Sequence, residues 1–123
     1  MISFDSFTLT DGIPIYLQIV RHIKQGLVAG IIIDGDELPS RRVLSALLGV
    51  NPNTIQKAYK ILEEEGFIQS HSGAKSYMSL TGEKIQEISN ELLENDARNA
   101  VNTLKQMGIT MAVAISLIEK YWN

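Results

Sequence analysis

The sequence of 123 residues contains no cysteine, which excludes disulfide bonds, thiolate zinc sites, iron–sulfur ligation and a cysteine nucleophile. Its two histidines, His22 and His71, lack the spacing of a metal-binding motif, and there is no glycine-rich phosphate loop. The acids at residues 63–65 are consecutive, so their side chains point in different directions. A general acid and a general base must instead face the same substrate. We therefore expect no enzymatic activity, no metal site and no cofactor.

Long apolar runs are also missing. The most apolar stretch, residues 111–118, is interrupted by Ser116 and is shorter than the ~20 residues of a membrane-spanning helix. The first twelve residues include two acids and no Lys or Arg, so they lack the basic start of a signal peptide. The expectation is a cytoplasmic protein with no membrane partner. A hydrophobic share of 45% is enough for a folded core.

The net charge of −3 is unevenly distributed along the chain. Residues 13–80 hold seven bases and six acids, whereas residues 1–12 and 81–123 are both net acidic. Affinity for nucleic acid depends on local charge more than on total charge. The middle segment is therefore compatible with binding a polyanion.

The middle segment begins with a predicted helix from Pro14 to Gly30. Proline suits the first helical position, apolar residues recur every three or four positions, and the glycine suits a left-handed cap. A turn at residues 34–36 and a short strand at Glu37 and Leu38 are expected next, because Pro39 disfavours helix there.

Two further helices follow closely. The first is short, with Ser40 as N-cap and Gly49 as stop, and its predicted apolar stripe comprises Val43, Leu44, Leu47 and Leu48. The second begins with Asn51 as N-cap and Pro52 at the first helical position, and ends at Gly66. Its inward stripe is Ile55, Ala58, Tyr59 and Leu62, and its polar face is Asn53, Gln56, Lys57 and Lys60.

A short helix, a tight turn and a longer helix outline a helix-turn-helix. Residues 67–71 and 76–80 are predicted to be two strands of a hairpin around a turn, which would form a wing. The expected fold class is therefore mainly α with a small β-hairpin: a winged helix-turn-helix domain at residues 13–80, preceded by an arm at residues 1–12. The sequence does not decide whether this arm packs on its own body or on a partner protomer.

Residues 81–123 predict a long helix ending at Gly108 and a last helix capped by Thr110. The last helix is apolar on most of its circumference, so it needs cover on several sides, and a second copy of the chain would supply it. We therefore expect a homodimer formed by the helical region 81–123. The predicted dimerisation residues are Leu93, Ala97, Ala100, Leu104, Met107, Met111, Ile115, Ile118 and Trp122.

A helix-turn-helix places the start of its second helix against base edges in the major groove, which makes Asn53, Thr54, Gln56 and Lys57 candidates for reading DNA. Arg41 and Arg42 open the short helix, where positive charge is locally unfavourable unless a phosphate lies nearby. The hairpin tip adds His71, Ser72, Gly73 and Lys75 as candidate wing contacts.

Several segments resemble the winged-helix domain of the GntR family of bacterial transcription regulators. They are Pro14-Ile15-Tyr16-Leu17-Gln18-Ile19, Gly35-Asp36-Glu37-Leu38-Pro39-Ser40, Gly49-Val50-Asn51-Pro52-Asn53-Thr54-Ile55 and Leu62-Glu63-Glu64-Glu65-Gly66. The resemblance spans residues 13–78. The start of the third helix and the short region 81–123 resemble the YtrA-type subfamily, whose two C-terminal helices serve dimerisation.

This resemblance implies a homodimeric regulator, a repressor, that binds an inverted-repeat operator in double-stranded DNA and controls a transporter operon. It implies operator contacts from Arg42, Asn51, Asn53, Thr54 and Gln56, and from the wing at His71, Ser72 and Gly73. Arg41, Gln56 and Lys75 depart from the residues common in the family, which leaves operator sequence and wing geometry open. The small-molecule effector, if one exists, is unknown.

Two alternatives stay open at this point. The winged helix is also compatible with a protein-interaction module whose polar helix face binds a protein. The apolar C-terminal helices are also compatible with sensing a small apolar ligand through Met111, Tyr121 and Trp122.

Overall fold

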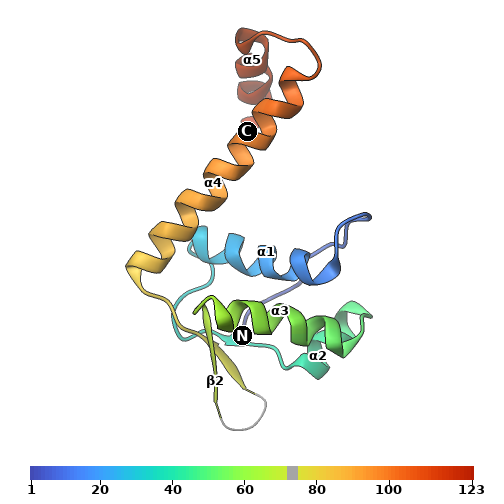
Figure 1. Ribbon diagram of the computed structural model, residues 1–123, viewed down its shortest axis with the longest axis vertical. Helices are drawn as coiled ribbons and strands as arrows, with labels where there is room; N and C mark the ends of the chain where they lie inside the picture. Colours follow the sequence, from blue (N-terminus) through green and yellow to red (C-terminus); the bar gives the residue numbers. More distant parts are fainter. Residues whose placement is uncertain (72–74) are drawn as a thin grey trace. The chain divides into compact units, whose positions relative to one another are not determined.

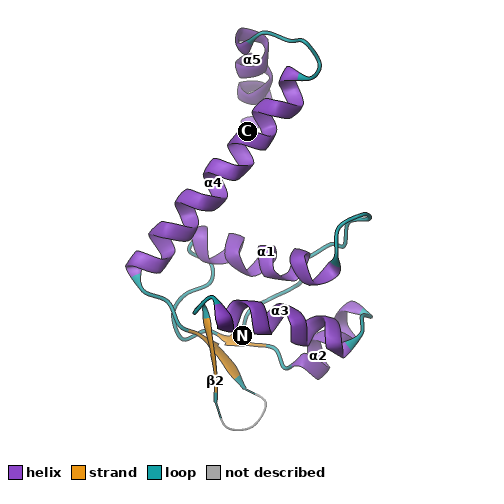
Figure 2. Cartoon of the chain, in the orientation of Figure 1, coloured by secondary structure: helices purple, strands orange, loops and turns teal. Residues whose placement is uncertain are grey.

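A computed structural model describes residues 1–71 and 75–123, which form two compact units, Met1–Ile88 and Ser89–Asn123. We call the first unit the head and the second the C-terminal unit. The elements are α1 (Ile15–Val28), β1 (Glu37–Leu38), α2 (Arg41–Leu48), α3 (Pro52–Glu64), β2 (Ile68–Ser70), β3 (Ser76–Met78), α4 (Gly82–Lys105) and α5 (Met111–Trp122) (Figures 1 and 2).

The predicted caps at the start of α2 and α3 are confirmed, whereas α1 ends at Val28 and α4 at Lys105, two and three residues before the predicted stops Gly30 and Gly108. The Ser40 hydroxyl accepts from the Val43 N–H at 3.1 Å, and Gly49 adopts a φ of 68° at the end of α2. Pro14 is the N-cap of α1 and not its first helical residue, because its ψ of 133° is extended. The helix therefore begins one residue later, at Ile15.

The core of the head is built where α1 packs on α3, side by side in Figure 1. The whole predicted inward stripe of α3 is buried, and it meets the buried side chains of α1, Ile19, Val20, Ile23 and Leu27. Burial of each Val, Leu or Ile side chain in this contact stabilises the fold by about 1.5–3 kcal/mol relative to exposure. The helical period then directs the opposite face of α3 to solvent.

The predicted apolar stripe of α2 is only partly correct. Leu44 is buried against α3, but Val43 and Leu47 are exposed. Ser45 is buried instead, and its hydroxyl donates to the Val50 carbonyl. A helix of eight residues has room for only a narrow contact with its neighbour, and the hydroxyl finds its partner inside that contact.

The wing belongs to a three-stranded antiparallel sheet of order β1-β3-β2. The hairpin pairs Ile68 with Met78, as expected from the predicted strands. The strand at Glu37 and Leu38 was also predicted, but its pairing with β3 was not. Pairing partners distant in sequence cannot be identified from a strand of two residues, since it carries almost no register information.

The arm at residues 1–12 packs on its own head. The Ile2 N–H donates to the Glu37 carbonyl at 2.8 Å, and Ile2 and Phe4 are buried. The rings of Phe4 and Phe7 lie against the His22 ring, with centroids 4.6 and 5.3 Å from it. The arm is therefore part of the core of the head.

The first turns of α4 are fastened to the head by Lys84. Its ammonium donates to the Gly66 carbonyl at 2.6 Å, just after α3, and to the Ser79 carbonyl at 3.3 Å, just after β3. Ile88, one turn further on, is buried. None of the helices in the described part of the chain is long and apolar enough to cross a membrane.

Tyr59 connects α3 to the segment that leads into α2. Its hydroxyl donates to the Pro39 carbonyl at 2.6 Å. Burial raises the pKa of the Tyr59 hydroxyl well above its usual value, and the nearby positive charge of Arg41 only partly opposes this shift. The hydroxyl therefore stays protonated and acts as a permanent donor that sets the geometry of the helix-turn-helix.

We expect Tyr59→Phe to lower the free energy of unfolding by about 1 kcal/mol, because it leaves the Pro39 carbonyl without this buried donor. For a domain of this size that corresponds to a drop in melting temperature of about 4–8 °C, measured by circular dichroism. Tyr121→Phe is the control, since Tyr121 is 75% exposed. Equal melting temperatures for the two variants would contradict the assignment.

Candidate nucleic-acid interface

The exposed face of α3 carries the polar side chains predicted from the sequence. Asn53, Gln56, Lys57 and Lys60 are exposed, and Thr54 is half-buried beside them. They lie opposite the stripe that packs on α1, so the core holds this polar surface in place. Amide side chains on a fixed helix have the donor and acceptor pairs that read base edges in a major groove.

The start of α3 is suited to hold a phosphate. The Asn51 side-chain oxygen accepts from the Asn53 N–H at 2.8 Å and so caps the helix. This leaves the Asn51 amide NH₂ group as a donor toward a partner. The helix dipole adds positive potential at the same end, and no acidic residue lies in the first turn.

The two arginines at the start of α2 have different surroundings. Arg42 is exposed, whereas Arg41 is half-buried, and its buried Nε has no hydrogen-bond partner among the described residues. Arg41 lines a groove of about 490 Å³ with Gln56, Lys60, Glu63, Glu64 and Ser70. Since carboxylates share this groove, the first two turns of α3 and Arg42 offer a surface better suited to a polyanion.

The two α3 lysines also differ in their neighbours. The Lys57 ammonium lies 4.0 Å from the centroid of the Tyr16 ring on α1. The Lys60 ammonium lies 4.0 Å from the Glu64 carboxylate, one turn along the same helix. Lys57 therefore faces an aromatic ring and Lys60 an opposite charge.

At the wing, the structure describes the two residues that flank the tip. The His71 N–H donates to the Lys75 carbonyl at 2.9 Å, and both residues are exposed. The His71 ring meets the Tyr77 ring edge-on, with centroids 5.2 Å apart. Ser72 and Gly73, the other predicted wing contacts, lie outside the described residues.

The C-terminal unit presents a large uncovered apolar surface. None of α5 is buried, and Met111 and Trp122 are 77% and 79% exposed. Of the remaining predicted dimerisation residues, only Leu104 is half-buried, and the exposed ones are Leu93, Ala97, Ala100, Met107, Ile115 and Ile118. Apolar patches of this kind on a single chain mark interaction surfaces.

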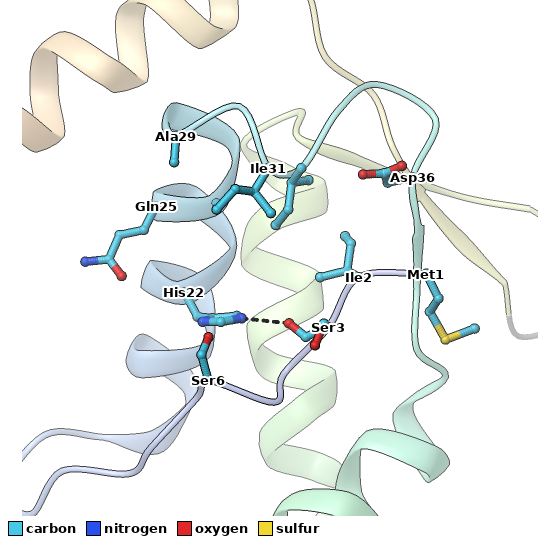
Figure 3. Close-up of a pocket in the computed structure, with 11 residues that line it drawn as sticks. Met1, Ile2, Ser3, Ser6, His22, Gln25, Ala29, Ile31 and Asp36 are labelled. Carbon is cyan, nitrogen blue, oxygen red and sulfur yellow. Dashed lines mark hydrogen bonds between the residues drawn. The ribbon is translucent and has the colours of Figure 1, made fainter.

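A hollow of about 400 Å³ lies between the arm and α1 (Figure 3). Two of its ionisable side chains, His22 and Asp36, already have partners in the fold. The His22 Nε2 atom is 3.0 Å from the Ser3 carbonyl, the dashed line in Figure 3, and the Asp36 carboxylate accepts from the Ile33 N–H. Among residues 1–71 and 75–123, no cluster of three or more His, Asp or Glu side chains is placed to hold a metal ion.

Residues 15–77 match the family described as bacterial regulatory proteins, gntR family. The HTH-type transcriptional repressor YtrA of Bacillus subtilis is 47% identical over 66 residues, which are 54% of this chain and 51% of that protein. A GntR family transcriptional regulator from Listeria monocytogenes has a similar solved structure, with a TM-score of 0.79, 34% identity and coverage of 91% of this chain and 98% of that one.

The DNA-binding domain of AraR, solved in complex with operator ORE1, is also similar. It has a TM-score of 0.51 and 26% identity, and the match covers 58% of this chain and 90% of that one. This neighbour is thus a solved example of a similar domain bound to operator DNA.

The two roles assigned to Asn51 can be separated by substitution. Asn51→Ala removes the cap and should lower the free energy of unfolding by about 1 kcal/mol. Asn51→Asp keeps the cap, and its charge suits the helix dipole, so the stability should be retained. Both variants lose the amide donor and should bind duplex DNA more weakly, with Asn99→Asp on α4 as the charge-matched control. An Asn51→Asp protein that binds DNA as tightly as the wild type would contradict the phosphate contact.

Proposed function

The chain belongs to the GntR family of bacterial regulatory proteins, and from this premise we propose that it acts as a homodimer that reads an inverted-repeat operator. As a family member it is a transcriptional regulator with a winged-helix DNA-binding fold. The observation that carries the proposal is the exposed polar face at the start of α3, held outward by the buried opposite face.

In this proposal the residues of the head have separate roles. Asn53 and Gln56 read base edges, since such amides pair with adenine through two hydrogen bonds, and Thr54 adds a shorter contact. Positively charged and amide donors around them hold phosphates and set the position of α3 in the groove. The phosphate-binding set is Arg42, Asn51 and Lys57, with Arg41 at its edge because carboxylates share the groove of Arg41. The wing set is His71, Ser72, Gly73 and Lys75.

The dimer follows in this proposal from the uncovered surface of α4 and α5. Two chains that bury these faces against each other would be related by a two-fold axis, which presents two heads to two half-sites of opposite orientation. In this division of roles the segment 13–80 would serve DNA binding and residues 81–123 would serve dimerisation, while the arm at residues 1–12 packs on the head.

The direction of regulation is proposed to be repression. Support comes from the similarity to the B. subtilis protein named as a repressor, which extends over half of either chain. The resemblance to the YtrA-type subfamily further suggests a transporter operon as the target. The site of action would be the chromosome, in the cytoplasm.

Selection of bound sequences from a random duplex pool tests the DNA-reading surface. The wild type should enrich a palindromic consensus. Asn53→Ala and Gln56→Ala should each loosen that consensus locally, because a lost base contact costs about 1–3 kcal/mol. Gln106→Ala, at an exposed residue in the turn just after α4, is the control and should leave the consensus unchanged.

If the folded, dimeric wild type enriches no sequence, the proposal fails in this form. Unchanged consensus sequences in both α3 variants would instead move the reading surface away from α3. A protein-interaction module is the alternative that the first result would favour, and the exposed Val43 and Leu47 of α2 would then be a candidate contact.

The dimer is tested separately by placing a charge on α5. Ile115→Asp should convert the dimer to a monomer in sedimentation velocity, since a carboxylate cannot be buried unpaired in an apolar interface. The loss of the second head should weaken binding to the palindrome by about 100-fold or more. Asn99→Asp is the control. A wild-type protein that sediments as a monomer at micromolar concentration would contradict the dimer.

A further inference from the structure

Tyr16 on α1 lies against Lys57 on α3, across the contact between these two helices. Tyr16 is the second residue of α1 and is half-buried, whereas Lys57 is exposed. Lys57 belongs to the polar face of α3 that is proposed to read DNA, which we call the reading face. The Lys57 ammonium lies 4.0 Å from the centroid of the Tyr16 ring, well within the range of a cation–π interaction. A residue outside α3 therefore contacts the cation that borders the reading face.

An aromatic ring holds a cation without cancelling its charge. The attraction comes from the ring quadrupole, so the ammonium keeps its full charge and can bind a phosphate on its solvent side. Lys60 provides the contrast on the same helix, because the Glu64 carboxylate 4.0 Å away offsets part of its charge. Of these two lysines, Lys57 is thus the one better prepared to meet a phosphate.

The ring also restricts where the ammonium lies. A lysine side chain is a flexible chain of four carbons, and it loses rotamer freedom when its ammonium binds a phosphate. A lysine already held over a ring has lost part of this freedom before DNA arrives, so binding costs less. Because α1 is packed on α3 through the core, the ring and the reading face keep a fixed relation.

We propose that Tyr16 is a positioning residue that holds Lys57 for a backbone phosphate beside the groove read by α3. This inference rests on the proposed function, since it needs the head to bind DNA. Tyr16 makes its contribution through the ring face and through Lys57, not through its hydroxyl.

The test measures affinity for the duplex that the wild type enriches from a random pool, over a series of salt concentrations. Tyr16→Leu should weaken binding about two- to fivefold, the range of an exposed cation–π contact, and Tyr16→Phe should match the wild type because it keeps the ring. Lys57→Gln should weaken binding and reduce the slope of log affinity against log salt by about one. Lys60→Gln, the matched control, should change the slope less.

The decisive measurement combines the two changes. Tyr16→Leu should cost nothing further in a Lys57→Gln protein, because its contribution passes through the lysine. Melting temperatures check that each variant is folded, and Tyr16→Met replaces Tyr16→Leu if the leucine variant is not.

The inference would be overturned if Tyr16→Leu weakened DNA binding by the same factor in the wild type and in the Lys57→Gln protein. It would also be overturned if the Tyr16→Phe protein bound DNA as weakly as the Tyr16→Leu protein. The second result would assign the contact to the hydroxyl. Either outcome leaves the proposed function standing as long as the wild type enriches a duplex. If the wild type enriches none, both the function and this inference fail.

Discussion

The packing of α1 against one face of α3 is the interaction on which the remaining architecture depends. Ile55, Ala58 and Leu62 are fully buried in it, so α3 cannot rotate about its axis without exposing apolar surface. The helical period then places Asn53, Gln56, Lys57 and Lys60 on the outer face. Tyr59 adds a directional constraint, because its hydroxyl ties α3 to the entry of α2. The core thus determines which side chains are available to a partner.

Charge acts on this framework locally. The chain is net acidic, yet many acids of the head are engaged in contacts that hold its segments together. Glu65 pairs with Lys24 at 3.0 Å. Asp36 accepts from the Ile33 N–H in the turn before β1, and Asp34 accepts from the Leu80 N–H just after β3. The start of α3 and Arg42 remain at the surface with helix N-termini behind them, which suits a phosphate backbone. The net charge of the whole chain does not show this difference between the engaged acids and the exposed start of α3.

Much of the head was predictable because its signals are local. Caps and breakers such as Ser40, Asn51 and Gly66 act within a few residues, and the α3 stripe repeats long enough to show its period. The pairing of β1 with β3 and the burial of Ser45 were not predictable, since both depend on neighbours distant in sequence or on a helix too short to show a stripe. The Tyr16–Lys57 contact was missed for the same reason, although both residues lie in segments that the sequence singled out.

The account makes the start of α3 the surface that meets DNA, and nuclear magnetic resonance tests this most directly. The side-chain amide signals of Asn51, Asn53 and Gln56 are followed while the duplex enriched by the wild type is added. The account predicts that these signals shift, while those of Asn99 on α4 and Gln106 just after it stay in place. The account would be contradicted if the side-chain amide signals of α3 stayed in place while the methyl signals of Val43 and Leu47 on α2 shifted.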